Sequence, residues 1–133
     1  MPVNLEDLFN ETKTIPVEIT SKAGKSYQIN VTYKPIEVTP AIVMKTMSLS
    51  KARDHIQAAT TVQETADIVE ELITDAATIL HRIVFDHDMF KSPEEKWNLT
   101  SIEDWKNVPE WIAFPILLAI TGDTQGEAET PAT

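Results

Sequence analysis

The stretch TVQETADIVEELITDAATILHRIVF, residues 61–85, decides the fold of this chain. Its apolar residues recur at spacings of three and four, which places them on one face of a helix. Thr61 precedes the run and Glu64 follows three residues later, the pattern of an N-terminal capping box. A helix whose apolar surface is this wide needs neighbours on two sides, so the chain is predicted to fold around it. A second apolar row beside the first consists of Ile68, Leu72 and Ile79.

A β-hairpin is predicted before this helix, over residues 15–34. Apolar and polar residues alternate along both halves of the segment, a period typical of strands with one buried face. The turn lies at residues 22–25, where Gly24 can adopt a positive φ. Pro16 lacks a backbone N–H, so the first strand is predicted at an edge of the sheet. An exposed strand edge is also a natural route to a homo-oligomer.

Three further helices are predicted around the long one. Thr39 and Pro40 suit the cap and the first turn of the first of these helices. Ser101 can cap the second, with Asp104 three residues on.

The last helix contains Pro115, six residues after Pro109, so it either kinks there or begins near Ala113. The polar residues after it are predicted to be disordered. The predicted bounds are 40–58, 61–85, 101–107 and 109–121 for the helices and 122–133 for the tail.

Together these elements predict an α+β fold in a single domain of residues 1–121. A two-stranded hairpin is marginally stable by itself, so its apolar face is predicted to pack on the helices. The expected architecture is a small N-terminal β-hairpin packed on a bundle of three to four α-helices, followed by a disordered C-terminal tail.

Composition narrows the classes of function. The 133 residues include no cysteine, which excludes disulfides and thiolate metal sites. A net charge of −10 repels phosphate backbones, so no nucleic-acid partner is expected. The longest apolar run, residues 111–120, is half of what a membrane helix needs. The N-terminal stretch has no secretory signal pattern, so we expect a soluble cytoplasmic protein without a membrane partner.

One group of side chains has the types that bind metals, and it consists of His81, Asp86, His87 and Asp88. A metal site needs at least three ligands that converge on one point. Asp86 follows His81 by five residues, a poor fit for one helical face, and the three later side chains diverge in any regular structure. The sequence therefore predicts a solvated acidic loop and no metal site; a metal-dependent enzyme using these four residues is the alternative.

The motifs of common enzymes are absent from the sequence. It contains no G-x-S-x-G motif, no phosphate-binding glycine loop and no Cys–His pair. Its serines and threonines are better explained as cap and turn residues. A non-enzymatic protein without cofactors is therefore predicted.

Tryptophans and methionines are the candidates for partner contact. Trp105 is predicted to lie in the core, whereas Trp97 and Trp111 are flanked by charges and suit the core and a binding surface equally. Methionines fill cores but also form adaptable binding surfaces. The candidate partner-binding residues are Met44, Met47, Ile68, Leu72, Ile79, Trp97 and Trp111.

The order of these elements and the C-terminal motif resemble a known family. A hairpin, a helix opened by Thr-Pro and a long helix precede a W-x-L-T segment, a Val-Pro pair and a final apolar helix. This arrangement resembles the tail assembly chaperones of long-tailed, siphophage-type bacteriophages. The residues that match their C-terminal region are Trp97, Leu99, Thr100, Pro109, Trp111, Ile112 and Ile116.

The resemblance implies a non-enzymatic function in building the virion. Such chaperones coat helical apolar segments of the tape measure protein before tail tube subunits polymerise around it, and then they leave. It implies that the protein binds the tape measure protein, with the tail tube protein as a further candidate partner. It places the protein in the bacterial host cytoplasm and not in the mature virion. The alternative is a small structural virion protein of the head–tail or tail tube region.

Overall fold

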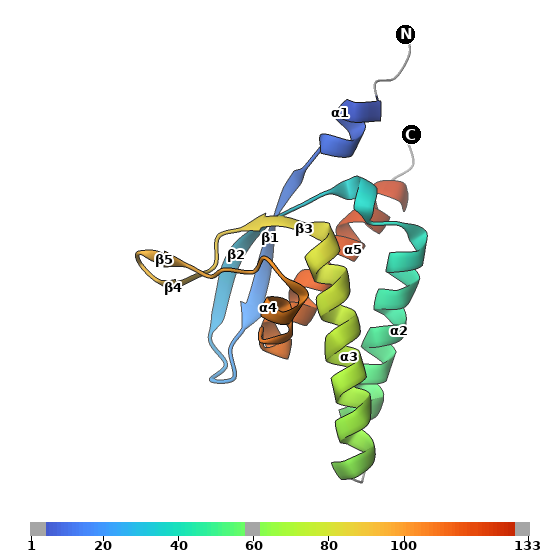
Figure 1. Cartoon of the computed structure of the whole chain (residues 1–133), viewed down its shortest axis with the longest axis vertical. Coiled ribbons are helices and arrows are strands. Elements are labelled where there is room, and N and C mark those ends of the chain that lie inside the picture. The colour runs from blue at the N-terminus through green and yellow to red at the C-terminus, as the bar shows by residue number, and fades with distance from the viewer. Residues whose placement is uncertain (1–4, 58–61, 130–133) are drawn as a thin grey trace.

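A β-sheet and a group of helices share one core (Figure 1). The computed structural model describes residues 5–57 and 62–129. The α+β prediction, with an N-terminal hairpin packed on helices, is confirmed. In chain order the elements are α1 (Leu5–Asn10), β1 (Lys13–Thr20), β2 (Ser26–Tyr33), the 3-10 helix η1 (Pro35–Glu37), α2 (Pro40–Gln57), α3 (Val62–Ile83), β3 (Val84–His87), β4 (Phe90–Ser92), β5 (Glu95–Lys96), α4 (Ile102–Lys106) and α5 (Glu110–Glu129).

The predicted hairpin forms from β1 and β2, which pair in antiparallel register from Lys13↔Tyr33 to Thr20↔Ser26. Alternate residues are buried along both strands, so one face of the sheet meets the core and the other is polar. Gly24 takes the positive φ of 86° that the turn requires. Strand β1 lies at the edge of the sheet, as Pro16 predicted.

The sequence predicted a loop after the long helix, and this prediction is wrong, because a third strand forms there. Helix α3 ends at Ile83, two residues before its predicted end, and β3 then pairs antiparallel with β2. His87 lies opposite Val31, and the backbone N–H of Lys34 donates to the carbonyl of Ile83 (3.1 Å). Strand β2 has a second edge whose backbone groups can pair. Pairing with this edge makes residues 84–87 a strand, although their sequence has only a weak strand pattern. Residues 90–96 form a second small hairpin, β4–β5.

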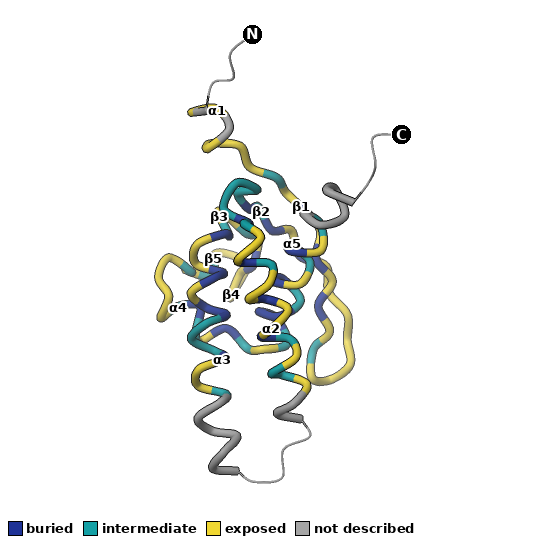
Figure 2. The backbone as a smooth tube through the Cα atoms, turned by 90° about the vertical axis from the view of Figure 1, so that its right-hand side faces the viewer, coloured by how far each residue is buried: buried dark blue, intermediate teal, exposed yellow. Residues whose placement is uncertain are grey.

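The core lies between the inner face of the sheet and the helices (Figure 2). Helix α5 packs against β1, and α3 is in contact with α2, α4 and α5. Tyr33 donates a hydrogen bond to Asp123 (2.5 Å), which ties the sheet to α5, and Lys13 pairs with the same carboxylate (3.0 Å). The largest fully buried side chains are Tyr33, Leu80, Ile83, Ile116, Leu117 and Ile120.

Helix ends agree with the capping chemistry of the sequence at two of three predicted sites. The hydroxyl of Thr39 accepts from the backbone N–H of Ile42 at the start of α2. Ser101 and Asp104 form a reciprocal capping box at α4, and hydrogen bonds from Ser101 and Thr100 lower the pKa of the Asp104 carboxyl. The third predicted cap, Thr61, lies outside the described residues.

The last helix is longer than the sequence suggested. It begins at Glu110 and continues through Pro115, so the alternative of a start near Ala113 is wrong. It passes Gly122, the predicted end, and reaches Glu129, while residues 130–133 lie outside the described residues. Among the described residues, no helix is both long and apolar enough to cross a membrane.

Candidate partner-binding surface

The two described side chains of the second apolar row of α3 do not form a surface. Leu72 is 5% exposed and Ile79 is 8% exposed, so both belong to the core, and the expectation that they contact a partner is corrected. The reason is that three helices of the same chain, α2, α4 and α5, cover α3. The side chain of Ile68, the third member of the row, lies outside the described residues.

The two methionines of α2 lie on its outer side. Met44 is 71% exposed and Met47 is 53% exposed, because Ile42, Thr46 and Leu49 take the inward positions of the same helix. Most methionines in small domains are buried, so two exposed ones in adjacent turns are notable. They are the predicted site residues that the structure brings together at a free surface.

A basic residue continues this row along the helix. Lys51 follows Met47 by four residues, is exposed, and has no acidic partner among the described residues. Residues 44, 47 and 51 therefore share one face, which we call the Met–Lys face, and Asp54 lies at its far end. On the neighbouring flank, Lys45 pairs with Asp75 of α3 (3.2 Å). The spacing of Met44, Met47 and Lys51 was readable in the sequence, but sequence analysis did not connect the lysine with the methionines.

Trp111 belongs to a second partly exposed row, on α5. It is half-buried and packs against the core, and Pro115 is half-buried one turn later. Leu118 continues the row and is 40% exposed. Trp111 thus serves the core and the surface together, and Leu118 is a surface residue that sequence analysis missed. Trp105 is buried, as predicted.

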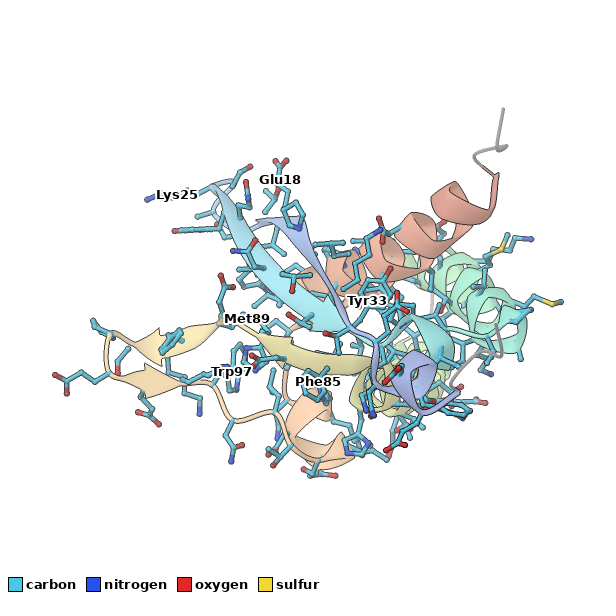
Figure 3. All side chains as sticks on the ribbon, turned by 90° about the horizontal axis from the view of Figure 1, so that it is seen from above. Glu18, Lys25, Tyr33, Phe85, Met89 and Trp97 are labelled. Atoms are coloured by element: carbon cyan, nitrogen blue, oxygen red, sulfur yellow. The ribbon has the colours of Figure 1, made fainter. Side chains whose placement is uncertain are left out.

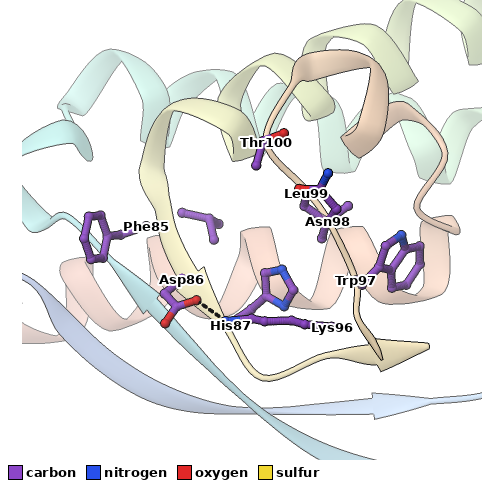
Figure 4. A pocket seen from close by; sticks show the side chains of 9 residues that line it. Phe85, Asp86, His87, Lys96, Trp97, Asn98, Leu99 and Thr100 are labelled. Atoms are coloured by element: carbon purple, nitrogen blue, oxygen red, sulfur yellow. Dashed lines mark hydrogen bonds and ion pairs between the residues drawn. The ribbon is translucent and has the colours of Figure 1, made fainter. Parts of the chain in front are cut away.

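Trp97 lies at the base of the β4–β5 hairpin rather than on the Met–Lys face. Its backbone N–H donates to the carbonyl of Met89 (3.0 Å), and Figure 3 shows the two residues beside each other. The side chain is half-buried against the core. It borders a cavity of about 430 Å³ between β3 and residues 96–100 (Figure 4).

Two titratable side chains of β3 line this cavity. Asp86 accepts a hydrogen bond from the Lys96 ammonium, and this bond lowers the pKa of the Asp86 carboxyl. The Nδ1 atom of His87 accepts from the backbone N–H of Met89 (3.0 Å). Burial lowers the pKa of His87, and the charge of Lys96 lowers it further. The charges of Asp86 and Asp88 oppose this shift without cancelling it.

The four candidate metal ligands are not brought together as a site. His81 contacts the carbonyl of Thr100 (3.2 Å), and Asp88 accepts two hydrogen bonds from Asn30 (2.7 and 2.9 Å). Asp86 and His87 are engaged as described above. Among the residues that the structure describes, no group of three or more His, Cys, Asp or Glu side chains could hold a metal ion.

The pKa of His87 predicts a pH dependence of stability. Since the folded state disfavours the charged imidazole, the unfolded state binds more protons as the pH falls through the usual His range. The contribution of His87 to stability is therefore complete above that range and is lost progressively as the pH falls through and below it. We expect the midpoint of urea unfolding to fall over this range of pH, and to fall less in His87→Asn. An identical pH dependence in His87→Asn and wild type would show that burial of His87 has no effect on stability.

Comparison with known proteins identifies no relative. No family model matches the chain, no curated protein matches it, and no solved structure matches it.

Proposed function

We propose that this protein is a non-enzymatic chaperone of phage tail assembly that binds helical apolar segments of the tape measure protein. The observation that carries the proposal is the exposure of Met44 and Met47 on adjacent turns of α2. The order of elements and the W-x-L-T segment support it from the sequence. In this function the protein works in the host cytoplasm and leaves before the virion is complete.

The Met–Lys face suits a helical client for physical reasons. Methionine is unbranched and polarisable, so its side chain adapts to different apolar partners. An amphipathic helix can place residues at spacings of three and four against such a face. The acidic surface elsewhere, with a net charge of −10 for the chain, keeps the complex soluble while the apolar client is shielded.

Replacing both methionines tests this function. We expect Met44→Glu/Met47→Glu to weaken binding to the tape measure protein of the same phage by at least about tenfold, because two apolar contacts are replaced by charges. Isothermal titration with a soluble tape measure fragment measures the affinity, and co-expression measures how much client stays soluble. Both residues are exposed, so the variant should keep the wild-type circular dichroism spectrum.

A matched control is available on the far side of the molecule. Phe90 lies on the β4–β5 hairpin and is 55% exposed, so Phe90→Glu introduces a charge at an equally exposed apolar site. We expect it to bind the client as wild type does. Equal binding by the methionine variant and wild type would refute the proposal.

Mass spectrometry of purified virions distinguishes the chaperone from the alternative, a small structural virion protein. A structural protein would be found in the particle and a chaperone would not.

A further inference from the structure

The N-terminal helix α1 stands apart from the rest of the fold. Figures 1 and 2 show it beyond the end of the sheet, joined to β1 by residues 11–12. It makes no extensive contact with another element of the described chain. Phe9 is 54% exposed on it. A short helix with an exposed aromatic residue gains little stability from its own chain and suits contact with another surface.

This segment has acidic residues around its exposed aromatic residue. Residues 5–11 include Glu6, Asp7 and Glu11 and contain no lysine or arginine. Asp7 and Glu11 are both exposed. The segment, which we call the N-terminal arm (residues 5–11), therefore presents an apolar residue together with negative charge.

Helix α2 offers the complementary surface. Its exposed methionines, Met44 and Met47, are followed by the exposed Lys51 of the Met–Lys face. Of the three cations of α2, Lys45 pairs with Asp75 and Arg53 pairs with Glu110, so Lys51 is the positive charge that the Met–Lys face itself offers. Apolar contact and opposite charge both favour pairing of the arm with this face, and opposite charges also set its orientation.

The link between arm and sheet favours a second molecule as the partner. Only residues 11 and 12 separate α1 from β1, so the position of the sheet limits where the arm can lie. In the structure α1 points away from the body (Figure 1). A neighbouring copy presents the same Met–Lys face without this restriction.

We propose that the N-terminal arm of one copy docks on the Met–Lys face of a second copy, so that the protein self-associates. Each copy has one arm and one face, so the contact closes as a reciprocal dimer or continues around a ring. The proposal rests on the arm and on α2, and it does not require the proposed chaperone function. The experiments below use no client, so a result that overturns self-association would not count against the chaperone function.

Sedimentation velocity over a concentration series of the full chain tests the apolar part of the contact. We expect a concentration-dependent oligomer in the wild type, and Phe9→Ser and Met44→Ser each to weaken self-association by about tenfold. Phe90→Ser is the matched control, an exposed phenylalanine away from both surfaces, and it should associate as wild type does. A monomer at every concentration, which includes an arm docked on its own chain, would overturn the proposal. So would an oligomer that Phe9→Ser leaves unchanged.

Charge reversal tests the electrostatic part. We expect Asp7→Lys/Glu11→Lys and Lys51→Glu each to weaken self-association, and the combination of all three in one chain to recover part of the loss. Added salt should weaken the wild-type oligomer, because exposed charges are screened. Additive losses in the combined variant would show that arm and face do not meet, and would overturn the proposal.

Discussion

Leu72→Asp should unfold the protein, not merely weaken a binding surface. Leu72 is 5% exposed within the core that α3 shares with its neighbouring helices. The substitution removes buried apolar volume and places a carboxylate in an apolar core. We expect the free energy of unfolding to fall by at least about 3 kcal/mol. Urea denaturation followed by circular dichroism measures this change.

Met47→Asp is the matched control for Leu72→Asp, since it makes the same kind of change at a helical residue that is 53% exposed. We expect its free energy of unfolding to fall by no more than about 0.5 kcal/mol, because the main change is the lower helix propensity of aspartate. Wild-type stability of Leu72→Asp would contradict the structure of the core. The comparison also guides binding experiments. If Leu72→Asp no longer binds the client, the cause is unfolding of the protein and not the loss of a contact residue.

Trp105→Ala should be comparably destabilising. Trp105 is buried on α4, beside a cavity of about 320 Å³ bordered by residues of α3, α4 and α5. Removing the indole enlarges this cavity and removes the main apolar contact of a helix only five residues long. We expect the free energy of unfolding to fall by about 3–5 kcal/mol. Thermal unfolding followed by circular dichroism checks the result.

Ile102→Ala provides the comparison for Trp105→Ala on the same short helix. Ile102 is 37% exposed, so its truncation removes much less buried surface. We expect a loss of less than about 1 kcal/mol. Equal effects of the two substitutions would mean that α4 is held by its capping box and not by Trp105.

Much of the fold could be predicted from local patterns. The alternation in residues 13–33 and the glycine at the turn specify a hairpin, because strand periodicity and turn chemistry are local properties. The cap at Thr39 and the box at Ser101 mark two helix starts for the same reason. The third strand could not be predicted this way. The segment VFDH has no strand alternation, and it pairs only because β2 offers a free edge at that place.

Only part of the candidate surface could be predicted from the sequence. Periodicity places Met44 and Met47 on one side of α2, but it does not state which side faces the core. The same limit explains the error at Leu72 and Ile79. A second apolar row on α3 is visible in the sequence, and whether it contacts a partner or its own chain depends on how many helices gather around α3.

The sequence by itself determined the elements, their capping and the apolar character of their faces, because these depend on residues a few positions apart. The tertiary structure alone decided which faces are covered. It buried Leu72 and Ile79 of α3, left the Met–Lys face of α2 open, and set α1 apart from the body. Burial depends on contacts between segments distant in the chain, and no local pattern contains them.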